Sequence, residues 1–181
     1  MIVWITGISG VGKTTLCEAL FRLLKPHLPE LVVLDGDIIR EIFGQELSHC
    51  ETDRVKQIKR IQAIARELDR QGLVVIVAAL YAHPDLLRWN KENFSGYFEV
   101  YLDAPLALVK SRDPKGLYAK TERGDMPHVV GVDIPWHAPT DFDLRIDASH
   151  APAPDELALE VLQAIPQLAG ALRVGSKEAA E

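Results

Sequence analysis

Eight residues near the amino terminus have the spacing of a phosphate-binding loop. Gly7 to Thr14 reads Gly-Ile-Ser-Gly-Val-Gly-Lys-Thr, which matches the pattern G-x-x-x-x-G-K-[ST]. Glycines let successive backbone N–H groups point at one anion, and the start of a following helix adds partial positive charge. The pattern predicts a nucleoside-triphosphate site in which Lys13 reaches the terminal phosphates and Thr14 holds Mg²⁺. The residues expected to bind the triphosphate are Gly7, Ser9, Gly10, Val11, Gly12, Lys13, Thr14 and Thr15.

Two carboxylates follow the second apolar run of the chain. Leu31 to Leu34 is a strand-type segment, and Asp35-Gly36-Asp37 comes directly after it. Ligands bind at the carboxyl ends of parallel strands, so both carboxylates are expected near the phosphate-binding loop. Phosphoryl transfer needs a group that orients the acceptor hydroxyl or takes its proton, and Asp37 is the predicted catalytic carboxylate. The alternative is that Asp37 only caps the next helix.

Several cations could complete such a site. Arg40 and Arg54 carry guanidinium groups that match phosphate or sulfate oxygens, although either could be a solvated helix residue. The long segment at 113–139 is rich in Gly, Pro, His and charge, and a connection of this length is often a functional lid. Lys115 is the best lid cation, and Arg112 could contact a nucleotide base or phosphate. Tyr81 could stack on a base or simply pack in the interior.

Alternating strand and helix patterns place these residues. The strand at 73–80 is a continuous apolar run, typical of a parallel sheet buried on both faces. Asp53 is expected to cap a long helix at 54–70. We therefore expect an α/β parallel sheet with helices on both faces, forming one domain over 1–174, with a frayed tail at 175–181. Further strands are predicted at 1–6, 31–34, 97–102 and 144–147, and further helices at 15–25, 38–43, 84–94, 105–112 and 155–172.

Composition narrows the class of protein. The chain has 181 residues and a formal net charge of −6, whereas nucleic-acid binders usually carry a basic excess. No apolar run is long enough to cross a bilayer, and the chain opens on a core strand without a signal peptide. Cys17 and Cys50 form no metal-binding pattern and suit a reducing cytoplasm. We expect a cytoplasmic protein with no nucleic-acid or membrane partner.

These motifs together resemble the adenylylsulfate kinase family, a group of P-loop kinases that phosphorylate the 3′-hydroxyl of adenosine 5′-phosphosulfate with ATP. The similarity covers about residues 2–147, and Arg112-Asp-Pro-Lys-Gly-Leu-Tyr118 is its most specific segment. The resemblance implies a P-loop nucleotide-kinase fold, with ATP and Mg²⁺ as cofactors. It also implies Asp37 as the acceptor-side catalytic carboxylate and allows a homodimer. Lys13 and the lid cation Lys115, which would offset charge on the transferring group, complete the predicted catalytic set, and Arg112 is predicted to contact the ATP. On the acceptor side, some predicted residues keep the family pattern and others replace a family residue at the same position. The full set is Asp35, Arg40, His49, Arg54, Gln57, Tyr81, Lys115, Leu117 and Val129.

The departures from the family pattern lie on the acceptor side. Tyr81 replaces the serine that follows the third strand, and Gln57 replaces an asparagine. His49 and Val129 stand where the family has phenylalanines that stack on the acceptor adenine. Losing such faces removes stacking worth about 1–3 kcal/mol each. The donor side is kept while the acceptor side changes, which is expected when a fold retains its reaction and alters its substrate.

We therefore predict an ATP-dependent kinase that phosphorylates a hydroxyl of a nucleotide-type acceptor, which is adenylylsulfate by resemblance. The alternative acceptor is another nucleotide conjugate such as cytidine diphosphoramidate, whose smaller base needs less stacking. A nucleotide-binding module without transfer activity is a further alternative, against which Asp37 and the Lys115 motif both argue. A guanine-specific switch is not supported, because the sequence has no Asn-Lys-x-Asp segment.

Overall fold

A single parallel sheet forms the centre of the molecule. The computed structural model describes residues 1–44, 46–113, 116–150 and 153–171. Within them five strands pair in the order β2-β3-β1-β4-β5, and every pairing is parallel. This confirms the predicted sheet. The strands are β1 (Ile2–Thr6), β2 (Leu31–Asp35), β3 (Val74–Ala79), β4 (Tyr97–Asp103) and β5 (Leu144–Asp147).

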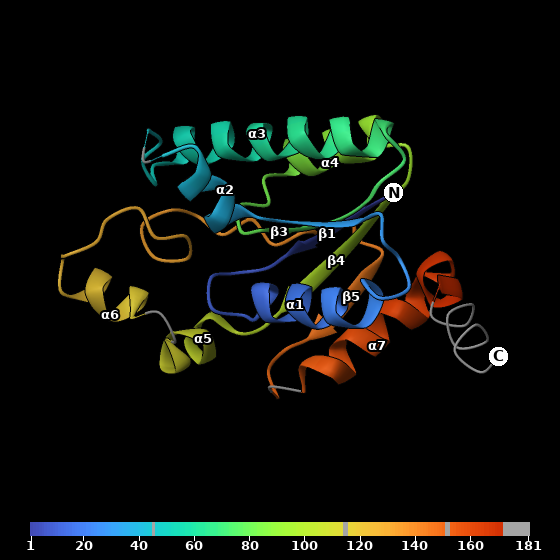
Figure 1. Cartoon of the computed structure of the whole chain (residues 1–181). Helices are drawn as coiled ribbons and strands as arrows, with labels where there is room; N and C mark the ends of the chain where they lie inside the picture. The colour runs from blue at the N-terminus through green and yellow to red at the C-terminus, as the bar shows by residue number, and fades with distance from the viewer. Residues whose placement is uncertain (45, 114–115, 151–152, 172–181) are drawn as a thin grey trace.

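Helices cover both faces of the sheet, as predicted. In Figure 1, α3 and α4 lie over one face, while α1 and α7 lie over the other. A further helical stretch at 166–171 follows α7. The predicted tail at 175–181 lies outside the described residues. The helices are α1 (Lys13–Leu24), α2 (Gly36–Ile42), α3 (Glu51–Arg70), α4 (Pro84–Asn93), α5 (Leu106–Arg112), α6 (Leu117–Glu122) and α7 (Pro154–Ala164).

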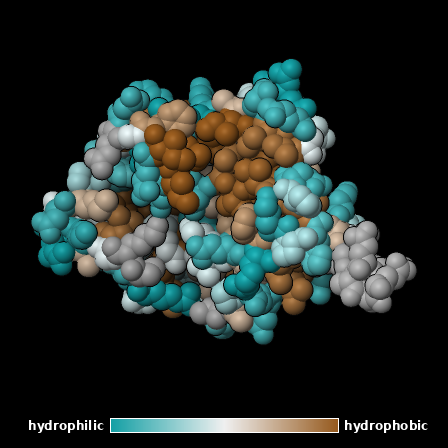
Figure 2. Space-filling view, viewed as in Figure 1, coloured by the Kyte–Doolittle hydropathy of each residue, from teal (hydrophilic) through white to brown (hydrophobic). Residues whose placement is uncertain are grey.

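Strand β1 shows why the apolar runs are continuous. Its side chains alternate between two separate hydrophobic clusters. Val3 and Ile5 pack with α1 and α7, whereas Ile2 and Trp4 pack with α3. A strand covered on both faces must be apolar at every position, so it loses the polar alternation of a half-exposed strand. Apolar surface is also visible from outside along the edge strand β2 and α2 (Figure 2), where Ile42 is 70% exposed.

The carboxyl ends of the strands gather the functional segments. Thr6 of β1 pairs with Ala79 of β3, and Asp35 of β2 pairs with Ala78. The segments that follow these strands therefore start from one edge of the sheet. The helices after β1 and β3 cover opposite faces, which opens a crevice between their loops.

Two local expectations differ from the structure. The long helix α3 begins at Glu51 rather than Arg54, and Cys50 caps it without a side-chain hydrogen bond. Asp53 therefore does not cap the helix; it lies in the first turn and accepts from the backbone N–H and hydroxyl of Ser48. The segment at 113–139 also contains a short helix, α6, which no periodicity indicated.

A buried carboxyl group lies beneath α4. Glu99 on β4 is 0% exposed, and the Tyr97 hydroxyl donates to its Oε2 at 2.7 Å. Its Oε1 has no hydrogen-bond partner among the described residues. The register partner of Glu99 on β1 is Trp4, whose Nε1 is also buried without a partner there. Burial raises the pKa of Glu99 from about 4.5 to about 7.

Replacing Glu99 by glutamine should change how stability depends on pH. The folded protein holds the Glu99 proton more tightly than the unfolded chain, so this contribution is complete below pH 4.5 and is lost as pH rises through 7. The free energy of unfolding should fall by roughly 3 kcal/mol over this window in wild type. Glu99→Gln should remove most of that slope in urea titrations. The exposed variant Glu160→Gln is the control, and equal slopes in all three proteins would show that Glu99 titrates normally.

Candidate active site

The loop after β1 forms a small concave cavity. Gly7 has no room for a side chain, because a Cβ there would lie 2.6 Å from the Leu102 carbonyl oxygen. Gly12 takes a left-handed conformation at φ 108° and is the N-cap of α1. The Lys13 ammonium folds over the loop and donates to the Gly7 and Ile8 carbonyls at 2.9 and 3.0 Å. The phosphate-loop cavity has a volume of about 250 Å³ and is lined by Ser9, Gly10, Gly12, Lys13, Thr14, Thr15, Asp35, Gly36, Asp37, Ala78 and Leu80.

Asp35 ties this loop to the next element. The Thr14 hydroxyl donates to Asp35 Oδ2 at 2.9 Å. The other carboxylate oxygen accepts from the backbone N–H of Asp37 at 2.8 Å and of Ile38 at 3.4 Å. Asp35 is therefore the N-cap of α2, and the alternative that Asp37 serves as that cap is wrong. Asp35 was expected on the acceptor side, but it lines only the phosphate-loop cavity.

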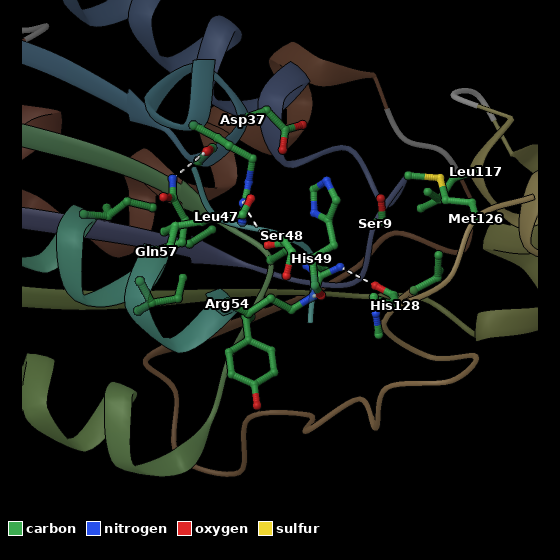
Figure 3. Close-up of a pocket in the computed structure, with 18 of the residues that line it drawn as sticks. Ser9, Asp37, Leu47, Ser48, His49, Arg54, Gln57, Leu117, Met126 and His128 are labelled. Carbon is green, nitrogen blue, oxygen red and sulfur yellow. Dashed lines mark hydrogen bonds between the residues drawn. The ribbon is translucent and has the colours of Figure 1, made fainter. Parts of the chain in front are cut away.

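A second, larger cavity adjoins the first. Its volume is about 620 Å³, within the usual range for a small-molecule site. Figure 3 shows Gln57 on one side of it and Leu117, Met126 and His128 of the 113–139 segment on the other, with Arg54 and His49 between them. Of the residues predicted on the acceptor side, the structure brings together here Arg40, His49, Arg54, Gln57, Tyr81, Leu117 and Val129.

Four residues line both cavities: Ser9, Gly36, Asp37 and Leu80. Among them, Asp37 alone carries a carboxylate, and its side chain is exposed. Asp37 therefore stands where a group in the phosphate-loop cavity would meet a group in the larger cavity. That is the position required of a carboxylate that orients an attacking hydroxyl.

Two buried or half-buried arginines give the larger cavity a positive field. Arg40 donates to the Leu47 and Ser48 carbonyls, and Arg54 donates to those of His49 and His128 at 2.8 and 2.7 Å. No carboxylate in the described part of the chain forms an ion pair with either. Burial lowers the pKa of both arginines, and the charge of Arg40 lowers that of Arg54 further. An anionic ligand would supply the missing negative charge.

His49 responds to the same field. Partial burial lowers its pKa below 6.5, and the charges of Arg40 and Arg54 lower it further. The imidazole is consequently neutral at pH 7. Tyr81 lines the same cavity, is 3% exposed, and donates its hydroxyl to Glu51 Oε1 at 2.6 Å.

The 113–139 segment rests on the phosphate-binding loop. The Tyr118 hydroxyl of α6 donates to the Ser9 carbonyl at 3.1 Å. Asp133 accepts from the backbone N–H groups of His128 and Val129, which holds this part of the cavity wall. Arg54 reaches the same wall through the His128 carbonyl.

Two predicted residues lie elsewhere. Arg112 donates to the Ala148 carbonyl at 3.0 Å and to the Ser149 carbonyl at 2.5 Å, in the segment that follows β5. It lines neither cavity. Lys115 lies outside the described residues. Sequence reasoning also missed some wall residues, because nothing in a single sequence distinguishes them from ordinary loop positions. These are Leu47, Ser48, Lys120, Met126 and His128.

The chemistry of the donor atoms limits what the site can hold. The Thr14 hydroxyl and the Asp35 carboxylate supply oxygen ligands, which Mg²⁺ prefers. Both residues line the phosphate-loop cavity. Elsewhere in the described ranges, no cluster of three or more His, Cys, Asp or Glu could bind a metal. The described helices include none long and apolar enough to cross a membrane.

Comparison with known proteins agrees with this geometry. The family model for adenylylsulphate kinase matches residues 1–147. The adenylyl-sulfate kinase of Deinococcus deserti is 38% identical over 156 residues, which cover 86% of each chain. That of Paraburkholderia xenovorans is 37% identical and covers 83% of this chain and 85% of its own.

Solved structures agree as well. The Mycobacterium tuberculosis APS kinase CysC, in complex with AMPPNP and APS, superposes with a TM-score of 0.82 at 33% identity. The match covers 91% of this chain and 96% of that one. A gluconokinase of Sinorhizobium meliloti, at 16% identity and a TM-score of 0.60 over 96% of each chain, shares the fold alone. The chain belongs to the adenylylsulphate kinase family and is an ATP-dependent kinase that phosphorylates a hydroxyl group.

Proposed function

We propose that this kinase transfers the γ-phosphoryl group of ATP to the ribose 3′-hydroxyl of adenylylsulfate. The observation that carries the proposal is the position of Asp37, which lines both the phosphate-loop cavity and the larger cavity. In this arrangement the first cavity takes the triphosphate of ATP and the second takes the acceptor. The named relatives, which are adenylyl-sulfate kinases, support this choice of acceptor.

On the donor side, backbone N–H groups of the loop would bind the phosphate oxygens, and Lys13 would exchange its two carbonyl partners for the terminal phosphates. Thr14 and Asp35 would hold Mg²⁺, which neutralises charge on the phosphates when bound. Asp37 would accept a hydrogen bond from the acceptor hydroxyl and orient its lone pair toward the γ-phosphorus. It would then take the proton as the hydroxyl oxygen bonds to the γ-phosphorus and the bond from that phosphorus to the bridging oxygen of ADP breaks, which releases ADP.

On the acceptor side, Arg40 and Arg54 would bind the phosphosulfate. Their present hydrogen-bond partners are all backbone carbonyls, so the phosphosulfate would be the first anion bound directly to these two guanidinium groups. Leu117, from α6, would pack against the nucleoside. Lys115 would add a cation to the transferring group, and Arg112 would contact ATP; both roles stay predictions.

The base of the acceptor is the part of the proposal with a specific alternative. His49 and Val129 line the larger cavity where the family places phenylalanines, and neither supplies a six-membered aromatic face. This observation favours a smaller base, such as that of cytidine diphosphoramidate, over adenine. A non-catalytic binding module is less well supported, because it gives no role to a carboxylate shared by two cavities.

Two further expectations stay predictions. A homodimer, which the resemblance allows, can be tested by sedimentation velocity on the purified chain. The cytoplasmic location can be tested by fractionating cells that express it.

Asp37→Asn should lower kcat at least a hundredfold while it changes the KM for ATP less than threefold, because the amide keeps its shape but cannot take a proton. Acceptor-dependent ADP release measures both constants. Asp155→Asn, on the exposed surface of α7, is the matched control. A large loss of ATP affinity with an unchanged kcat would instead assign Asp37 to the metal side of the site.

His49→Phe should raise kcat/KM for adenylylsulfate about tenfold, because it restores one stacking face. The same change should affect cytidine diphosphoramidate less. His49→Leu is the control, since it removes the imidazole without adding a face. Equal effects of the two substitutions would contradict stacking at this position.

Acceptor-dependent ADP release by the wild-type protein, measured with adenylylsulfate and with cytidine diphosphoramidate, identifies the acceptor. Turnover of adenylylsulfate supports the proposal, and turnover of the cytidine conjugate alone would favour the alternative. No ADP release with either acceptor would contradict both.

A further inference from the structure

The 113–139 segment places a histidine on the wall of the larger cavity. His128 is exposed and lines this cavity, and Figure 3 shows it on the side away from Gln57. Its neighbour Val129, which stands where the family has a stacking phenylalanine, is 2% exposed and packs in the hydrophobic core. Val129 therefore presents almost no surface to a ligand. Of these two neighbours, only His128 offers a side chain that a ligand can reach.

The backbone of His128 is held in an unusual conformation. Its φ of 67° lies in the left-handed region, which residues with a side chain seldom adopt. Asp133 accepts from the backbone N–H groups of His128 and Val129, and Arg54 donates to the His128 carbonyl at 2.7 Å. These hydrogen bonds hold the strained turn from both sides. Strain of this kind persists only where the surroundings enforce it, and it is concentrated at ligand sites.

Arg54 links His128 to the other histidine of the cavity. Its Nε donates to the His49 carbonyl at 2.8 Å, and its Nη2 donates to the His128 carbonyl. Both histidines line the larger cavity, although they belong to segments far apart in the sequence. One guanidinium group therefore sets the position of both backbones. Among the described residues no ring contact joins the two imidazoles, so neither ring covers the face of the other.

The two imidazoles also share one electrostatic environment. Partial burial is the main reason why the pKa of His49 is lowered, the charges of Arg40 and Arg54 lower it further, and His128 contributes as well. The two histidines are therefore close enough to interact across the cavity. Histidine rings are among the side chains on which nucleotide bases stack.

We propose that His128 is a further specificity-determining residue of the acceptor site, and that its imidazole stacks on the base of the bound nucleotide. The inference rests on the proposed function, because it needs a nucleotide acceptor in the larger cavity. Arg54 would bind the anion of the acceptor while it holds the carbonyls of His49 and His128, which couples recognition of the anion to recognition of the base. Adenylylsulfate and cytidine diphosphoramidate both carry a base, so the contact is expected with either.

Calorimetric titration in the presence of ADP measures acceptor binding without turnover. The probes are adenylylsulfate and ribose 5-phosphosulfate, which carries the same anion without a base. Cytidine diphosphoramidate and its base-free counterpart replace them if wild type turns over only the cytidine conjugate. His128→Asn removes the ring but keeps a residue type that tolerates the left-handed backbone. It should weaken binding of the acceptor roughly tenfold and leave binding of the base-free probe unchanged.

Two further variants separate stacking from other effects. His128→Phe keeps a ring but has no nitrogen atoms, so it should bind the acceptor at least as tightly as wild type does. His27→Asn is the matched control, because His27 is exposed and lines neither cavity. This control should leave binding of both probes unchanged.

The possible outcomes are distinguishable. Wild type that binds neither adenylylsulfate nor cytidine diphosphoramidate contradicts the proposed function. Wild type that binds its acceptor no more tightly than His128→Asn does overturns the inference alone. Equal weakening of both probes in His128→Asn would assign His128 to the anion, and a loss of binding in a folded His128→Phe would indicate a polar contact; either result overturns stacking. The comparison with His128→Asn decides the matter if His128→Phe does not fold.

Discussion

The hydrogen bond from Thr14 to Asp35 is the interaction on which the rest of the site depends. It joins the first turn of α1 to the carboxyl end of β2, two segments that the sheet brings to one edge. The same carboxylate caps α2 and so sets the direction in which Asp37 leaves the strand. One buried side chain thus fixes the phosphate-binding loop, the start of α2 and the carboxylate of Asp37 relative to one another. Because Asp35 is 7% exposed, its hydrogen bonds are protected from competition by water.

The second constraint is electrostatic. A chain with a net charge of −6 nevertheless concentrates positive charge around its larger cavity, where Arg40 and Arg54 have only carbonyl partners. Carbonyl dipoles hold the guanidinium groups in place without neutralising them. The cavity is therefore suited to an anion. Burial lowers the pKa of His49, and the charges of the two arginines lower it further. In the proposed function, donor and acceptor meet at Asp37, the one ionisable residue common to both cavities among the residues described.

The sheet could be predicted from the sequence because β1 and β3 are covered on both faces. Every position of such a strand is apolar, and a continuous apolar run of strand length is typical of a buried parallel sheet. The sequence predicted the loop conformation because glycines at this spacing favour it, and it placed Asp37 at the carboxyl end of a strand, whereas the catalytic role of Asp37 stays a prediction. It missed the true start of α3, where Cys50 caps without its side chain, and the six-residue helix α6. It also could not predict how the cavity closes. Arg54 and His128 are 74 residues apart, Ser9 and Tyr118 are 109 apart, and in each pair the acceptor is a backbone carbonyl that every residue type carries.

The central claim is that a phosphoryl group passes from the phosphate-loop cavity to a ribose hydroxyl in the larger cavity. The most direct test follows γ-¹⁸O-labelled ATP by ³¹P NMR while the wild-type protein acts on adenylylsulfate. The account predicts that the label appears in a phosphomonoester on the ribose 3′-carbon of the acceptor. Label that appears only in inorganic phosphate, or in a phosphoanhydride of the acceptor, would contradict it.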